Sequence, residues 1–317
     1  MRFPDLDKLS AMQTMGGITD LSDRELQNCI RIAFQSQISD VGAKQAMRSS
    51  SAFAIVTGGT SGIGAAIAQN LLARGLQVLV IARRRAGYEA QRAALPPHLV
   101  DRLSFLALDV RDAPGLRAGL DAAIAARGAP DWVVTCAGVA EPGRFLDLPL
   151  ACHEMQWATN YAGTLNVLRI CAPAMVNAGG GRLVLISSAA ALGTFYGYSA
   201  YAPSKFAVRA LGDILGLELR PHGISVTTAF PPDTDTAQLA EEKPRRPPVA
   251  ARFLAGNPVL SPEVVAMEIL AAAERGRTHV APGAGTRLFL RMPRLFDAVF
   301  RWQQRRLAAR LRQDPTS

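Results

Sequence analysis

The sequence is poor in cysteine and has no long apolar run, and each absence excludes a class of protein. The four cysteines, Cys29, Cys136, Cys152 and Cys171, show neither a CxxC motif nor Cys/His metal spacing. We therefore expect free thiols, a reducing compartment and no bound metal. No apolar run reaches the roughly eighteen residues of a transmembrane helix. The start, MRFPDLDKLS, carries acidic residues and leads into no apolar segment, so we expect no secretory signal and a cytoplasmic location.

Acidic residues are scarce in one part of the chain. Lys and Arg number 35 and Asp and Glu 26, which gives a formal net charge of +9. Residues 286–312 alone hold eight arginines and one acid, Asp297, so the rest is close to neutral. Nucleic-acid-binding proteins spread basic residues over a folded face or a recognised motif, and no nucleic-acid partner is expected. Hydrophobic residues make up 49% of the chain, enough for a full core, which excludes a largely disordered protein.

The first part of the chain, 1–50, is a polar extension. Within it, Ser22 and Glu25 form a capping-box pattern ahead of apolar residues that recur every four positions over 26–38. This pattern predicts one short amphipathic helix. Met47 lies just ahead of the first strand, so an overlong start is an alternative explanation of the extension.

The second part, 51–283, alternates between apolar strands and helical stretches. Near-continuous apolar runs, typical of parallel strands buried on both faces, cover 52–57, 76–82, 103–110, 131–137, 181–188 and 224–230. Helix-length segments between them cover 62–74, 113–127, 160–177 and 203–220. This order predicts an α/β fold, a single domain with a Rossmann-type doubly wound parallel sheet. A Pro-rich loop, 231–260, then precedes a helix capped by Ser261.

A glycine-rich segment, TGGTSGIG over 57–64, follows the first predicted strand and opens a helix. Glycines there let the backbone approach a pyrophosphate, which the amide donors and dipole of the helix N-terminus favour. The strand–turn–helix context makes the motif much stronger than glycines alone, although a turn without a ligand is the alternative. The predicted cofactor contacts are Gly58, Thr60, Ser61, Gly62, Ile63 and Gly64.

The residues after the second predicted strand favour NADP(H) over NAD. An acid there would hold the ribose 2′-hydroxyl, but the chain has Arg83, Arg84 and Arg85. Guanidinium groups match a phosphate in charge and geometry, and Arg83 is the best placed of the three. Arg84 and Arg85 are equally well explained as a solvated basic turn. Asp109 and the neighbouring amide of Val110 are predicted to contact the adenine.

Tyr201 and Lys205 are four residues apart in YAPSK, which places them on one face of a helix. A lysine ammonium favours the phenolate and is expected to lower the tyrosine pKa, as proton transfer to a carbonyl requires. The pair gains weight from the ordered motifs ahead of it: the glycine-rich segment, Cys136-Ala137-Gly138, Asn160, and Ser187-Ser188.

These five ordered motifs resemble the short-chain dehydrogenase/reductase family over about residues 52–283. The resemblance implies that Tyr201 is the general acid/base and that Lys205 lowers its pKa and binds the nicotinamide ribose. It implies that Ser188 polarises the substrate carbonyl and that Asn160 holds a water relaying protons to the lysine.

The family's Asn-Asn-Ala-Gly is Thr-Cys-Ala-Gly here, ending in Ala137 and Gly138, which still let the backbone approach the cofactor. Cys136 in that motif is then a small packed hydrophobe.

The segment PPDTDT, 231–236, is unusual after the sixth strand, and it is similar to the 3-ketodihydrosphingosine reductase subfamily. Pro231, Thr234 and Thr236 are predicted to contact the cofactor. The resemblance implies NADPH-dependent reduction of 3-dehydrosphinganine to sphinganine by a homodimer or homotetramer. Another NADP(H)-dependent reductase, of 3-oxoacyl or hydroxysteroid type, is the alternative. A non-catalytic NADP-binding sensor is a third hypothesis. The presence of all four residues of the catalytic tetrad, Asn160, Ser188, Tyr201 and Lys205, argues against it.

The last part, 284–317, is basic and amphipathic. After Pro293, apolar residues share one broad side: Leu295, Phe296, Val299, Phe300, Trp302, Leu307 and Leu311. Arg294, Arg301, Arg305 and Arg312 share the other, while Arg306 and Arg310 break the pattern. Such a helix, over 287–312, predicts peripheral contact with the cytoplasmic membrane face. Packing on the domain or on a second subunit is the alternative.

Overall fold

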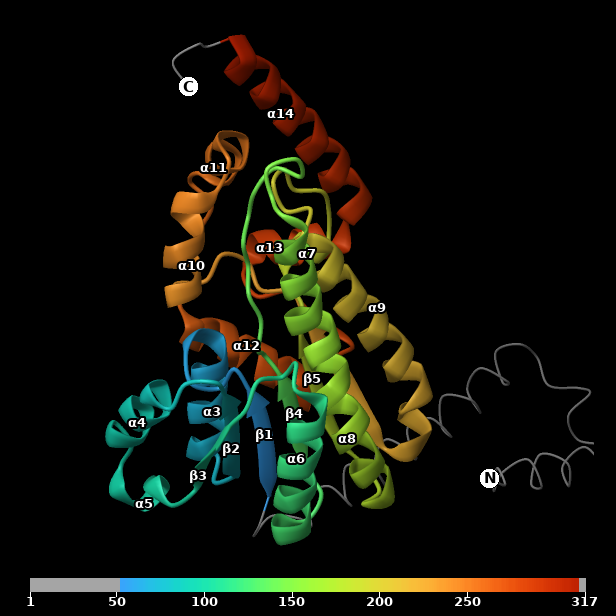
Figure 1. Ribbon diagram of the computed structural model, residues 1–317. Coiled ribbons are helices and arrows are strands. Elements are labelled where there is room, and N and C mark those ends of the chain that lie inside the picture. Colours follow the sequence, from blue (N-terminus) through green and yellow to red (C-terminus); the bar gives the residue numbers. More distant parts are fainter. Residues whose placement is uncertain (1–51, 314–317) are drawn as a thin grey trace, which may run out of the picture. The chain divides into compact units, whose positions relative to one another are not determined.

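A seven-stranded parallel sheet forms the centre of the computed structural model, which describes residues 52–313 (Figure 1). The strand order is β3-β2-β1-β4-β5-β6-β7. The strands are β1 (Phe53–Thr57), β2 (Gln77–Ala82), β3 (Leu103–Ala107), β4 (Trp132–Thr135), β5 (Gly181–Ile186), β6 (Ile224–Ala229) and β7 (His279–Val280). The predicted helix over 26–38 and the question of the start at Met47 lie outside the described residues.

The helices follow the strands in the alternation that the sequence predicts. They are α3 (Gly62–Ala73), α4 (Ala86–Ala93), α5 (Pro97–Val100), α6 (Ala113–Arg127), α7 (Leu150–Trp157), α8 (Gly163–Asn177), α9 (Tyr201–Glu218), α10 (Ala237–Glu242), α11 (Pro248–Leu254), α12 (Pro262–Glu274), α13 (Ala284–Arg291) and α14 (Pro293–Gln313). A π-helical turn at Ala158–Ala162 joins α7 to α8.

Both faces of the sheet are buried, which explains the near-continuous apolar strands. Along β1, Ala54 and Val56 pack against residues of α3 and α12 on one face. Phe53 and Ile55 pack against residues of α6, α8 and α9 on the other. The α/β fold with a Rossmann-type sheet is therefore confirmed.

The strand ends differ from the prediction in an informative way. Six strands are where the sequence predicts them, but 108–110 and 136–137 have already left the sheet. These residues follow the carboxyl ends of β3 and β4, where open α/β sheets place their ligand-binding loops. The two-residue β7 is too short for a sequence pattern to predict.

Two helical predictions need correction. The helix expected over 160–177 begins earlier, because α7 and the π-helical turn continue directly into α8. The segment 231–260, predicted as a loop, contains α10 and α11. Proline does not prevent a helix at its first position, and Pro248 begins α11. The Ser261 cap is confirmed, because its hydroxyl accepts the Val264 N–H at 3.3 Å.

The C-terminal helices α13 and α14 pack on the domain. Phe289 of α13 is buried, and Phe296 and Phe300 of α14 pack against the same cluster. The buried Gln304 side chain accepts the Tyr196 N–H at 2.7 Å and so ties α14 to the loop before α9. With α10 and α11, these helices lie beyond the carboxyl ends of the strands (Figure 1).

Candidate active site

The glycine-rich segment forms a narrow cradle at the start of α3. A Cβ on Gly58 would lie 2.9 Å from the Ala137 Cα, and one on Gly62 would lie 2.8 Å from the Thr236 Cγ2. Both glycines have positive φ, +64° and +51°, a conformation that side chains disfavour. Only glycine therefore lets this segment lie against the ends of β4 and β6.

The other predicted contacts of this segment divide into two groups. Ser61 is the N-cap of α3, has no side-chain cap bond and lines a cavity together with Ile63. Its neighbourhood therefore keeps the backbone donors of the helix N-terminus available to an anion. Gly64 and Thr60 are closely packed: a Cβ on Gly64 would overlap the Gly58 carbonyl, and a Cβ on Gly87 of α4 would lie 2.7 Å from the Thr60 carbonyl oxygen. Their contact with a cofactor stays a prediction.

The three arginines after β2 are not equivalent. All three are exposed, but their contacts differ. The Arg85 guanidinium carbon lies 5.9 Å from the centre of the Tyr88 ring and 5.5 Å from that of Phe105. Arg85 thus packs on aromatic rings, whereas Arg83 and Arg84 are unconstrained by such contacts.

The predicted adenine contacts are Asp109 and Val110. The Asp109 carboxylate is held by Arg111, with 2.7 Å between Oδ2 and Nη2, and this hydrogen bond holds its pKa below the usual range. Val110 is buried, and its carbonyl accepts the Asn166 side-chain N–H at 3.0 Å. The adenine contact stays a prediction, and Arg111 is a charged neighbour that the sequence did not single out.

Asn160 holds the loop after β4 in place. It lies fully buried in the π-helical turn, where its Oδ1 accepts the Val139 N–H at 2.8 Å and its Nδ2 donates to the Val139 carbonyl at 3.0 Å. The same Nδ2 donates to the Ser204 hydroxyl at 2.9 Å. A Cβ on Gly138 would lie 3.2 Å from Asn160 Oδ1 and 3.3 Å from Lys205 Nζ, so the predicted residues converge.

Tyr201, at the start of α9, faces Ser188 after β5. Both side chains line the same cavity, and Ser188 is positioned by accepting the Ala190 N–H at 3.1 Å. The buried Lys205 Nζ donates to the Ile186 carbonyl at 2.9 Å and lies 5.8 Å from the centre of the Tyr201 ring. The structure therefore brings together all four residues of the predicted tetrad.

Burial governs the pKa values of this group. It raises the pKa of Tyr201, and the hydrogen bond with Ser188 lowers it only in part. Burial lowers the pKa of Lys205 from 10.5 to about 8. The sequence predicts a lowered tyrosine pKa from the charge of the lysine alone, whereas in the structure the cost of placing either charge out of water dominates. Burial also raises the pKa of Cys136 to about 11, which fits a packed thiol rather than a nucleophile.

The segment 231–236 crosses in front of the glycine-rich cradle. The Pro231 carbonyl accepts a backbone N–H from the turn after Ser188 at 2.9 Å. The Thr234 hydroxyl donates to the Pro232 carbonyl at 2.9 Å, and the Thr236 hydroxyl accepts a backbone N–H of α10 at 3.2 Å. Both hydroxyls thus shape the loop, and their contact with a cofactor stays a prediction.

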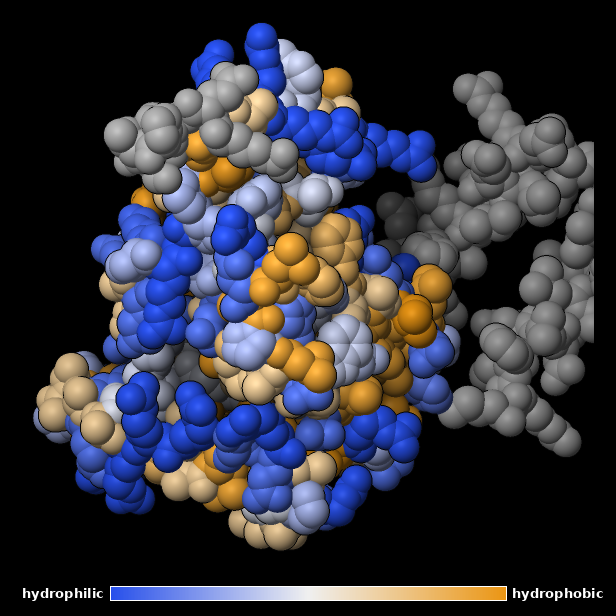
Figure 2. Space-filling view, turned by 45° about the horizontal axis from the view of Figure 1, so that its top comes forward, coloured by the Kyte–Doolittle hydropathy of each residue, from blue (hydrophilic) through white to orange (hydrophobic). Residues whose placement is uncertain are grey.

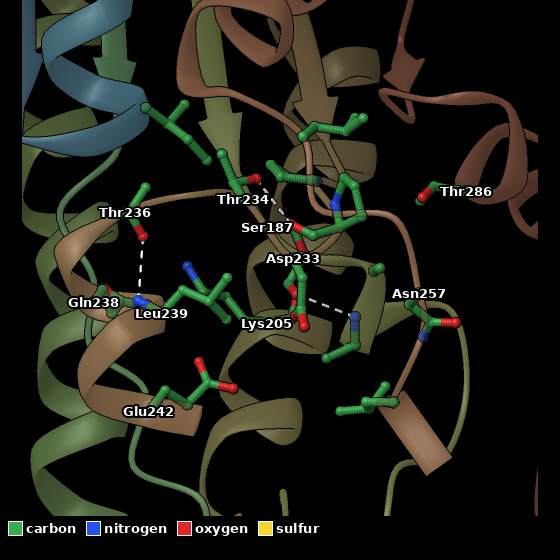
Figure 3. Close-up of a pocket in the computed structure, with 18 of the residues that line it drawn as sticks. Ser187, Lys205, Asp233, Thr234, Thr236, Gln238, Leu239, Glu242, Asn257 and Thr286 are labelled. Atoms are coloured by element: carbon green, nitrogen blue, oxygen red, sulfur yellow. Dashed lines mark hydrogen bonds between the residues drawn. The ribbon is translucent and has the colours of Figure 1, made fainter. Parts of the chain in front are cut away.

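A cavity of about 610 Å³ joins these elements (Figure 3). It is lined by the cradle, by Ser188, Tyr201 and Lys205, and by aromatic side chains from several helices. The aromatic wall consists of Phe195, Phe253, Phe289, Phe296 and Phe300, with ring centres of contacting pairs 5.0–6.3 Å apart. One end of the cavity is suited to a phosphate-bearing ligand and another part to an apolar one. Within residues 52–313, no cluster of three His, Cys, Asp or Glu side chains is placed to hold a metal ion.

Residues 52–247 match the family described as short chain dehydrogenase. The chain belongs to the short-chain dehydrogenase/reductase family. It is 32% identical over 237 residues to the 3-ketodihydrosphingosine reductase of Bos taurus, covering 74% of this chain and 71% of that protein. It is 31% identical over 245 residues to the 3-dehydrosphinganine reductase of Danio rerio, covering 75% and 73%.

Among solved structures, a short-chain dehydrogenase from Streptomyces avermitilis has a similar fold. The TM-score is 0.68 at 26% identity, and the match covers 80% of this chain and 97% of that one. Short-chain dehydrogenases are oxidoreductases that bind a nicotinamide cofactor, and the cradle between Gly58, Gly62 and α3 has the form that its pyrophosphate requires.

Several residues of this short-chain dehydrogenase site have no sequence signal of their own. The Thr57 hydroxyl accepts the backbone N–H groups of Cys136 and Ala137 at 3.1 and 3.2 Å, which joins β1 to the loop after β4. Ser204 joins Asn160 to the Tyr201 carbonyl, to which it donates at 2.7 Å. The contacts of Thr57 and the Ser204–Asn160 bond link positions tens of residues apart, so only the folded chain reveals them.

Proposed function

We propose that this protein is an NADPH-dependent reductase of a long-chain ketone and that it reduces the 3-keto group of 3-dehydrosphinganine to give sphinganine. The observation that carries the proposal is the aromatic wall, which continues the cavity at Tyr201 and Ser188. An alkyl chain gains free energy on leaving water for such a wall, in proportion to the apolar area buried. The names of the two vertebrate relatives support the same substrate.

The chain's own residues supply proton transfer and orientation. Ser188 and Tyr201 would hold the ketone oxygen, and the Tyr201 hydroxyl would donate the proton that converts it to an alcohol. Lys205, fixed by the Ile186 carbonyl, would stabilise the phenolate that remains. The cradle would hold the pyrophosphate of NADPH, which supplies the hydride when bound, and Arg83 its 2′-phosphate.

A substrate panel tests the proposal. Purified protein with NADPH is offered 3-dehydrosphinganine, a 3-oxoacyl thioester and a steroid ketone, and NADPH oxidation is followed by absorbance. We expect the highest kcat/KM with 3-dehydrosphinganine. A preference for either other ketone would overturn the substrate assignment, and no turnover of any ketone would favour the sensor.

Arg83→Asp tests the choice of cofactor. A carboxylate at this position would repel the 2′-phosphate and accept the ribose hydroxyl of NADH. We expect the Kd for NADPH to rise by ~10–100-fold, as for the loss of a charge-assisted hydrogen bond, with little change for NADH. Arg84→Asp is the matched control, because it removes an adjacent exposed guanidinium. Equal effects of the two variants on both cofactors would place the phosphate elsewhere.

We further propose that α14 lies on an anionic membrane surface. One side of α14 packs against the domain. On the other side lie Leu295, Val299 and Trp302, which are 53%, 41% and 56% exposed. Exposed arginines flank them, among them Arg301 and Arg305. Apolar side chains beside basic ones suit a membrane interface, where each basic residue contributes about 1 kcal/mol.

Figure 2, in which the top of the Figure 1 view comes forward, shows hydrophobic residues exposed among hydrophilic ones. No helix in residues 52–313 is long and apolar enough to cross a bilayer.

Trp302→Glu tests this surface. We expect the native protein to float with vesicles that contain anionic lipid at low salt and to be released as salt rises. The variant should stay in solution, with an unchanged oligomer size, because Trp302 is exposed. Trp157→Glu is the control, since it adds the same charge at a residue 46% exposed on α7. If Trp302→Glu instead changed the oligomer size and left flotation intact, the outer side of α14 would be a subunit interface.

A further inference from the structure

We propose that Glu242 binds the ammonium group next to the ketone of the substrate, so that the pocket selects amino ketones over plain ketones. This inference rests on the proposed function. In 3-dehydrosphinganine the carbon that carries the amino group is bonded directly to the carbonyl carbon. Any residue that recognises the amine must therefore lie beside the groups that hold the carbonyl.

Glu242 belongs to a buried charged cluster in the wall of the cavity. The Arg246 guanidinium donates to Glu242 Oε1 at 2.8 Å and to Asp233 Oδ1 at 2.9 Å, and the Tyr198 hydroxyl donates to the same Glu242 oxygen at 2.6 Å. The side chains of Arg246 and Glu242 are only 4% and 10% exposed. Tyr198 lines the cavity, and so do Asp233 and Glu242, which are labelled in Figure 3.

The cluster carries a net negative charge. Burial would lower the pKa of Arg246, but the hydrogen bonds with Asp233 and Glu242 raise it, so the guanidinium stays charged. Two carboxylates and one guanidinium leave one negative charge in a wall that is largely shielded from water. An unpaired buried charge is costly, and a cation that entered the cavity would offset that cost.

One carboxylate oxygen of Glu242 is free to accept a hydrogen bond. Among the described residues, the hydrogen bonds to this carboxylate end on Oε1, and Oε2 accepts none. Glu242 is 8% exposed overall, and the surface that remains lies in the cavity wall. A primary ammonium has three donors in a compact group, which suits a single carboxylate oxygen.

The cluster lies next to the reacting centre. The rings of Tyr198 and Tyr201 are 6.1 Å apart, and the Tyr198 hydroxyl ends on Glu242. The negative charges of Glu242 and Asp233 both act on Tyr201 and help to raise its pKa. An ammonium bound at Glu242 would counter this effect and stabilise the phenolate that remains after proton donation. Recognition and proton transfer are thereby coupled.

The test compares two ketones in two variants. Glu242→Gln keeps the shape and the bond from Tyr198 but removes the charge. The substrates are 3-dehydrosphinganine and its analogue with hydrogen in place of the amino group. We expect the native protein to prefer the amino ketone, and Glu242→Gln to lower kcat/KM for it by ~10–100-fold, the range for a hydrogen bond to a charged group. The kcat/KM for the analogue should not fall, because the variant also removes a charge that raises the pKa of Tyr201. Glu241→Gln removes a neighbouring exposed charge on α10 and should leave both values unchanged.

The remaining outcomes separate the two proposals. If the native protein reduced neither ketone, the proposed function would fail. If it reduced both equally well, or if Glu242→Gln lowered both kcat/KM values by one factor together with the melting temperature, Glu242 would be structural only. Should Glu242→Gln not fold, Asp233→Asn removes a charge from the same cluster and should reduce the preference for the amino ketone. An unchanged preference in that variant would overturn the inference.

Discussion

Tyr201→Phe is expected to lower kcat by ~10²–10⁴-fold, the range for general acid–base catalysis. The variant loses the hydroxyl that, in the proposed mechanism, donates the proton to the ketone oxygen. The phenyl ring can still pack in the cavity wall, so the Kd for NADPH should stay within about threefold of the native value. Steady-state kinetics and quenching of intrinsic fluorescence by NADPH give the two quantities.

Tyr196→Phe is the matched control for this variant. Tyr196 lies five residues earlier, and its backbone N–H, not its hydroxyl, contacts Gln304. It lies outside the lining of the catalytic cavity. We expect native kcat from Tyr196→Phe. Near-native turnover by Tyr201→Phe would mean that another group donates the proton and that the tetrad assignment is wrong.

Lys205→Met should also lower kcat by ~10²–10⁴-fold, because the phenolate of Tyr201 would lose its cationic neighbour. Its second effect is on stability, since the buried ammonium of Lys205 has a pKa of about 8 against an ordinary 10.5. Between these values the unfolded chain binds a proton that the folded chain has released. The free energy of unfolding attributable to Lys205 therefore rises with pH over this window.

Urea unfolding at pH 7.5 and at pH 10.5 measures this linkage. The unfolding free energy of the native protein minus that of Lys205→Met should increase by roughly 2–3 kcal/mol as the pH rises. Groups common to both proteins cancel in the difference. Arg209→Met is a control at another position of α9, where the charge does not titrate in this range. A difference that did not change with pH would show that Lys205 keeps its ordinary pKa.

The sequence by itself determined the fold class and the order of the sheet's helices and strands. Buried parallel strands need apolar side chains on both faces, and this requirement leaves a continuous pattern such as 76–82. The glycine-rich segment and the Tyr201–Lys205 spacing were equally readable, because each depends on residues a few positions apart. What the sequence pattern overstated was the strand length at 108–110 and 136–137, since residues that line a site can be as apolar as residues that pair.

Only the tertiary structure decided the character of the pocket. The aromatic wall collects side chains from Phe195 to Phe300, and no local pattern predicts that these rings meet. The basic, amphipathic appearance of α14 hid the fact that Phe296 and Phe300 complete this wall. In the charged cluster Glu242 and Arg246 are only four residues apart, but Asp233 and Tyr198 reach them through the fold. Local periodicity indicates which face of a helix is apolar. It does not indicate what that face packs against, because contacts between distant segments form only when the whole chain packs.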